Sequence, residues 1–229
     1  PDDTADTADT GTLIEPTWCE SQGLTSRDFT PGASGGFGTA GDFDTAVPDF
    51  TWSLMDGSEW VMSEEWSGCD VYVMINYYPE YDYPVNLGKS WKIADWLEAS
   101  PLNVHYFFFS YAAEDEIESE LTSMKESIDD GIDSLDSELE AHWSDRVHYV
   151  TDSGWSADWI GGLNGDYYVS GEYVNWSTSI DRFGNSRENG SFCDPSDGWE
   201  TCPPIFMAYE AQYFNFESDR QDVLDAEAD

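Results

Sequence analysis

The stretch Cys69–Asn76, CDVYVMIN, decides the fold of this chain. Its centre, Val71–Ile75, is apolar throughout and lacks the polar alternation of a strand with one face in water. Such a run is typical of a strand that is buried on both faces of a parallel sheet. Val104–Phe109 is a second run of the same kind, and Trp91–Ala99 predicts a short helix between them, ended by Pro101. The order strand, helix, strand indicates a parallel crossover.

The longest periodic signal follows the second strand. Between Glu114 and Trp143, apolar residues recur at steps of three or four, with carboxylates at most other positions. This spacing predicts one long helix with a single apolar stripe, which Gly131 weakens by about 1 kcal/mol without ending it. We expect the stripe to pack against the sheet. The residues of the stripe are Ile117, Leu121, Met124, Ile128, Ile132, Leu135, Leu139 and Trp143.

Shorter elements are predicted on either side of this centre. Phe50–Met55 and Trp60–Met62 flank the turn residues Asp56 and Gly57, which indicates an N-terminal hairpin. Four later segments are predicted: a strand at Val147–Val150, a helix or loop at Trp155–Gly165, a hairpin of Trp176–Asp181 with Ser186–Phe192, and a closing helix at Ile205–Phe216. Strands that alternate with helices and end in a hairpin predict an α/β domain.

The charge balance excludes several classes of partner. The chain carries 48 acidic and 8 basic side chains, a formal net charge of -40. A phosphate backbone or an anionic membrane surface would be repelled, so we expect no nucleic-acid binding. No apolar run approaches the roughly 18 residues that a membrane-spanning helix needs. Two interpretations of the charge stay open, a halophile-like surface and an ordinary solvated acidic face.

The cysteines indicate the compartment. Cys19, Cys69, Cys193 and Cys202 form no C-x-x-C pair, and an even number favours two disulfides in an exported protein. Cys193 with Cys202 is the natural local pair, which would leave Cys19 to pair with Cys69. All three pairings remain open, as does the alternative of free buried thiols in a cytosolic protein. We therefore expect an extracytoplasmic location: the periplasm, the cell surface or the medium.

Four regions are predicted along the chain. Residues 1–12, PDDTADTADTGT, have little to bury and are expected to be a disordered acidic tether. A Gly-, Thr- and Asp-rich arm covers 13–46, the folded domain 47–216, and an acidic tail or linker 217–229. The tether resembles the start of mature bacterial surface lipoproteins, which implies a lipid anchor on a cysteine upstream of Pro1.

A family resemblance runs through the domain. It is carried by Val47–Thr51 (VPDFT), the turn Met55–Gly57 (MDG), the central strand Val71–Asn76 and the late segment Ile180–Gly184 (IDRFG). In this order they resemble a redoxin-type (AhpC/TSA-like) thioredoxin-like domain between about Val47 and Phe192. The resemblance implies a central mixed sheet flanked by helices.

The departures of this chain from the redoxin pattern argue against redox chemistry. The family places a nucleophilic cysteine after the central strand, where helix-terminal amides lower its pKa. Here that stretch is Tyr77–Pro84, YYPEYDYP, and it has no cysteine; Gly171–Ser179 also lacks the family's cis-proline. The resemblance therefore implies a scaffold without redox activity, a non-enzymatic binding or structural module. An active redoxin that uses Cys193 and Cys202 remains the alternative, although we expect no such activity.

A second resemblance concerns Ile180–Gly184 together with Ala208–Glu217 (AYEAQYFNFE). The pair is similar to a segment of large secreted bacterial proteins that continue into a peptide-N-glycosidase F-like amidase region. It implies, as an alternative, that the chain is the N-terminal accessory region of such an amidase. No catalytic residue of an amidase is carried over to this chain.

The candidate binding site is the loop after the central strand, because α/β folds place ligands outside the carboxyl ends of their strands. Its tyrosines and carboxylates suit a glycan, through ring stacking and hydrogen bonds, or a basic peptide. The candidate residues are Tyr77, Tyr78, Glu80, Tyr81, Asp82 and Tyr83.

No catalytic residue, cofactor or metal ligand is assigned from the sequence. His105 and His148 lie on separate predicted strands that could bring them together. We interpret them as ordinary strand histidines. Clustered carboxylates in several loops are compatible with weak calcium binding.

Overall fold

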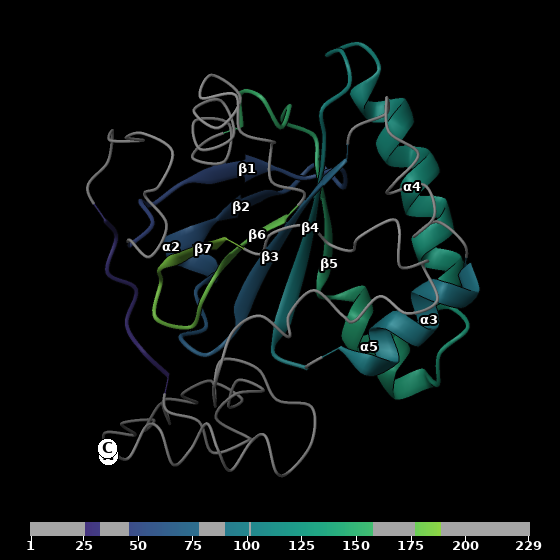
Figure 1. Ribbon diagram of the computed structural model, residues 1–229, viewed down its shortest axis with the longest axis horizontal. Helices are drawn as coiled ribbons and strands as arrows, with labels where there is room; N and C mark the ends of the chain where they lie inside the picture. Colours follow the sequence, from purple (N-terminus) through teal and green to yellow (C-terminus); the bar gives the residue numbers. More distant parts are fainter. Residues whose placement is uncertain (1–25, 33–45, 78–89, 101, 158–176, 189–229) are drawn as a thin grey trace, which may run out of the picture.

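The fold is taken from a computed structural model that describes residues 26–32, 46–77, 90–100, 102–157 and 177–188 (Figure 1). The predicted tether and acidic tail, and the predicted helix Ile205–Phe216, lie outside the described residues. In the described ranges no helix is both long enough and apolar enough to cross a bilayer.

Within the described residues, five strands form a mixed sheet at the centre of the domain, in the order β5-β4-β3-β6-β7. Its strands are β3 (Val71–Tyr77), β4 (Val104–Ser110), β5 (Val147–Val150), β6 (Ser177–Ile180) and β7 (Ser186–Glu188). β3, β4 and β5 run parallel, whereas β6 pairs antiparallel with β3 and β7 antiparallel with β6. The predicted mixed sheet with parallel crossovers and a terminal hairpin is confirmed.

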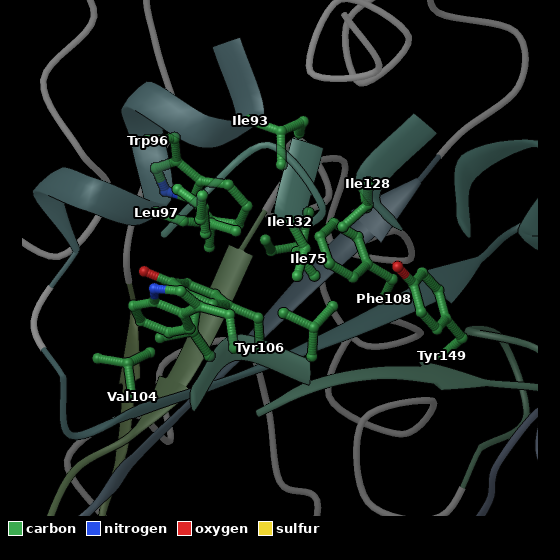
Figure 2. Close-up of a cluster of buried hydrophobic side chains, with 14 of the residues drawn as sticks. Ile75, Ile93, Trp96, Leu97, Val104, Tyr106, Phe108, Ile128, Ile132 and Tyr149 are labelled. Atoms are coloured by element: carbon green, nitrogen blue, oxygen red, sulfur yellow. The ribbon is translucent and has the colours of Figure 1, made fainter. Parts of the chain in front are cut away.

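The helices of the crossovers cover one face of this sheet (Figure 1). They are α3 (Ser90–Ala99), α4 (Ile117–Ile132) and α5 (Ser137–Ser144). Figure 2 shows side chains of α3 and α4, among them Ile93, Leu97 and Ile128, packed onto Tyr106 and Phe108 of β4. Fully burying an aliphatic or aromatic side chain of this size contributes about 1.5–3 kcal/mol, so this layer stabilises the domain strongly.

The prediction of one continuous helix between Glu114 and Trp143 is wrong. α4 ends at Ile132, and α5 begins at Ser137 after the N-cap Asp136, whose Oδ1 accepts from the Glu138 and Leu139 amides at 3.0 and 3.1 Å. The apolar spacing does not reveal the break, because apolar side chains on both sides of it, such as Ile132 and Leu139, still reach the same core. An Asp side chain that caps the backbone competes with continued helix at that position.

A two-stranded hairpin and a short helix cover the other face. They are β1 (Thr51–Ser53), β2 (Glu59–Val61) and α2 (Met62–Glu65), and the hairpin is the one expected around Asp56 and Gly57. Gly57 has φ +87°, a backbone conformation that residues with a side chain rarely adopt.

Two tryptophans fix the hairpin to the sheet. The rings of Trp52 and Trp60 pack edge-on against Phe107 of β4, with centroids 5.2 and 4.9 Å away. β3 and β4 therefore lie between two apolar layers, which explains why both strands are apolar without alternation.

Candidate functional site

The structure places only one residue of the predicted binding loop. Tyr77 is the last residue of β3 and pairs in register with Ser110, the last residue of β4. It lies at the carboxyl edge of the parallel strands, and its role in binding stays a prediction. The other candidates lie outside the described residues: Tyr78, Glu80, Tyr81, Asp82 and Tyr83.

An exposed tryptophan lies at this same edge. Trp155 follows β5 by five residues and is 41% exposed. Its ring meets that of Tyr111 edge-on with centroids 4.9 Å apart, and its Nε1 donates to the Tyr111 carbonyl at 3.4 Å. The indole is thus held from two directions while much of its surface faces outward.

The turn beneath Trp155 keeps the tryptophan close to the strand end. The Gly154 amide donates to the Ser110 carbonyl at 2.9 Å. A Cβ at Gly154 would lie 2.3 Å from the Tyr111 ring, so only glycine lets the two segments approach this closely. The Ser153 carbonyl accepts from the Ala157 amide at 2.7 Å, which closes the turn.

The sequence predicts a helix or loop at Trp155–Gly165 and does not single out Trp155 as a site residue. The available signal was a Gly-Trp pair shortly after a strand, at the edge where this fold class binds ligands. That signal was insufficient because the contact with Tyr111 joins residues 44 positions apart.

A cluster of polar side chains lies at the opposite edge of the sheet, at the amino ends of β3, β4 and β5. His105 Nδ1 and His148 Nε2 are 3.0 Å apart, so the two histidines on separate strands are neighbours. His105 Nε2 lies 3.6 Å from Asp70 Oδ2, and Arg146 donates to Asp70 Oδ1 at 3.1 Å. The four side chains form one row, in which Asp70 is buried and the others are mostly buried: Arg146, Asp70, His105 and His148.

Burial and charge shift the pKa values in this row. Burial by itself would raise the pKa of Asp70, but His105 and Arg146 outweigh it and hold that pKa well below the ordinary range. Burial is also the largest influence on the histidines, and it lowers the pKa of His105 and brings that of His148 to about 3. Both imidazoles are therefore neutral at pH 7, and Asp70 is ionised.

The geometry of these groups does not match a metal centre. Within the described part of the chain, no three side chains among His, Cys, Asp and Glu are arranged to hold a metal ion. The cluster lies beneath the hairpin at the end of the sheet opposite to Trp155. We interpret it as a structural element that can titrate.

Cys69 is disulfide-bonded and fully buried, directly before Asp70 at the amino end of β3. The three other cysteines, Cys19, Cys193 and Cys202, lie outside the described residues. Which of them pairs with Cys69 therefore stays a prediction. This sulfur is at the opposite end of the central strand from the edge where the resemblance would place a reactive cysteine.

Comparisons with known proteins add little to this geometry. No protein-family model matches the chain, and no curated protein resembles it significantly. Among solved structures, the chain is similar to MTB dsbF "in its mixed oxidized and reduced forms", with 11% identity and a TM-score of 0.36. The match covers 65% of this chain and 89% of that one. The strand order, the crossovers and the N-terminal hairpin are consistent with a thioredoxin-like fold.

Proposed function

We propose that this chain is a non-redox, thioredoxin-like binding module whose ligand is a glycan. The observation that carries the proposal is Trp155, an exposed indole that contacts Tyr111 at the carboxyl edge of the sheet. An exposed aromatic surface with nearby polar groups suits the flat apolar face and hydroxyl rim of a sugar ring. Tyr77 ends its strand at the same edge, and the acidic tyrosine-rich segment follows it in the sequence.

The absence of a suitable cysteine supports a non-redox role. Residues 70–192 contain no cysteine, so β3, β4 and β5 carry no thiol at their carboxyl ends. Disulfide exchange requires a thiolate that is accessible to the other disulfide, whereas Cys69 is buried and already oxidised.

An extracytoplasmic location is part of the proposal. A disulfide at Cys69 persists in oxidising compartments, and a net charge of -40 favours a protein that stays soluble in a saline medium. We propose that the acidic N-terminal segment serves as a tether to a lipid anchor.

The test is a glycan array probed with the whole chain and with the Trp155→Ala variant. We expect the variant to bind at least about tenfold more weakly, the equivalent of about 1.4 kcal/mol. Phe183→Ala is the matched control, because Phe183 is 49% exposed but lies in the β6–β7 turn at the other end of the sheet. The variants Tyr78→Ala and Tyr81→Ala test the sequence-predicted part of the site.

Two results would contradict the glycan proposal. One is binding to no glycan together with Trp155-dependent binding to a basic peptide array, which would make the ligand a peptide. The other is glycan binding that the Trp155 and tyrosine variants leave unchanged, which would move the site elsewhere.

The alternatives from the sequence have their own assays. An active redoxin would reduce insulin disulfides in the presence of a thiol donor, and we expect no reduction. An accessory region of an amidase would raise deglycosylation by a peptide-N-glycosidase F-like continuation of the gene, measured with and without residues 1–229.

A further inference from the structure

The neutral histidine pair lies directly beneath the N-terminal hairpin. The Trp60 ring on β2 covers both imidazoles, with centroids 4.8 Å from His148 and 5.4 Å from His105. Other rings line the pair: Phe107 is stacked on His148 at 4.6 Å, and Tyr72 on His105 at 5.5 Å. The imidazoles are thus part of the apolar layer that holds the hairpin to the sheet.

There is room for only one hydrogen atom between His105 Nδ1 and His148 Nε2, the two nitrogens that face each other. With His105 Nε2–H directed at Asp70, His105 Nδ1 is an acceptor and His148 Nε2 is its donor at 3.0 Å. A proton added to the pair introduces a positive charge beneath Trp60. A second proton would place two N–H groups against each other and force the rings apart.

Some of the charged groups around the pair favour protonation of the histidines, and others oppose it. Asp70 and Glu65 favour protonation of His105, and Asp56 in the hairpin turn favours protonation of His148. Arg146 opposes both protonations, and the pKa of His148 is lowered further by the charge that His105 would carry. Burial is the largest influence on each histidine and also disfavours the charged form.

We propose that His105 and His148 form an acid-sensitive latch, which holds the β1–β2 hairpin on the sheet while both are neutral and releases it when they are protonated. In the open state the imidazoles meet water and Trp60 leaves the sheet. The backbone contacts between hairpin and β5, such as the Met55 amide to the Tyr149 carbonyl at 2.9 Å, open with it.

The direction of the pH effect follows from linkage. The pKa of His148 is about 3 when the hairpin is closed and has its ordinary value near 6.5 once the ring is solvated. The open form therefore binds more protons between these values, and lowering the pH through this window favours opening. From pH 7 to pH 4.5, His148 alone shifts the opening equilibrium roughly 70-fold.

Hydrogen exchange on the whole chain tests the latch, with rates expressed as protection factors to remove the intrinsic pH dependence. From pH 7 to pH 4.5 we expect protection of the β1–β2 amides to fall on the order of 50-fold, while the β4 amides, buried between both layers, lose far less. The double variant His105→Phe/His148→Phe replaces both polar partners by apolar rings and is expected to abolish this difference.

His142→Gln is the matched control. Its ring contacts the Leu102 carbonyl from α5, which packs on the opposite face of the sheet, and burial lowers its pKa to about 4. This variant is expected to keep the acid response of the hairpin. His148→Gln, whose amide can still donate to His105, is the second test should the double variant not fold, and it should weaken the response at least tenfold.

Two outcomes overturn the proposal. The first is that acid lowers the protection of β4 as much as that of the hairpin, which would indicate global unfolding. The second is that the double variant, or His148→Gln in its place, keeps the full acid response, which would assign the titration to other groups.

Discussion

Replacing Asp70 by Asn tests the row of four polar side chains most directly. Asp70 is 4% exposed at its side chain, and its oxygens lie 3.1 Å from Arg146 Nη1 and 3.6 Å from His105 Nε2. Asn has nearly the same volume, so the substitution removes the charge and little else. It leaves a guanidinium that is only 12% exposed facing a neutral amide.

The expected cost follows from the burial of both partners. Removing one member of a buried ion pair costs about 3–5 kcal/mol, because the remaining charge stays in a medium of low polarity. Asn retains one acceptor oxygen for Arg146, which places the expectation near the lower bound, about 3 kcal/mol. This is a large share of the roughly 5–15 kcal/mol by which a domain is stable.

Urea unfolding at pH 7, followed by tryptophan fluorescence, measures the effect. With a slope of about 2 kcal/mol/M, Asp70→Asn should lower the midpoint by about 1.5 M. Asp49→Asn is the control, since the Asp49 carboxylate is exposed and accepts hydrogen bonds from the amide and hydroxyl of Ser63 at 3.0 and 2.8 Å. The control should cost about 1 kcal/mol or less.

The pH dependence of this difference has a definite sign. His105 and Arg146 hold the pKa of Asp70 below its ordinary value of 3.8 in the folded state. Its contribution is therefore complete above that value and is lost as the pH falls below it. A cost for Asp70→Asn below about 1 kcal/mol at pH 7, or one that grows below pH 4, would refute the reasoning.

Three further predictions concern other parts of the fold. Gly154→Ala should cost about 1–3 kcal/mol and weaken ligand binding, because its Cβ would overlap the Tyr111 ring; unchanged urea unfolding would contradict this. Asp136→Ala should cost about 1 kcal/mol by removing the N-cap of α5, measured as loss of thermal stability, and a neutral result would mean that packing alone restarts the helix. Reducing the disulfide at Cys69 should lower stability by about 2–4 kcal/mol, and equal urea midpoints with and without a phosphine reductant would rule this out.

The sequence alone predicted the central elements of the fold. β3 and β4 were evident because a strand covered on both faces must be apolar at every position, and this property is local to the strand. The hairpin turn at Asp56 and Gly57 and the parallel crossover were likewise encoded in short segments. The order of these segments predicted an α/β domain, and the family resemblance implied its mixed sheet flanked by helices.

The sites were determined by tertiary structure. His105 and His148 meet across 43 positions, Asp70 and Arg146 across 76, and Tyr111 and Trp155 across 44. Those contacts depend on the register of the parallel strands and on which layer covers each face, and neither leaves a periodic trace in the sequence. The end of α4 was hidden for a related reason, since apolar spacing records which side chains reach the core and not whether the backbone between them stays helical.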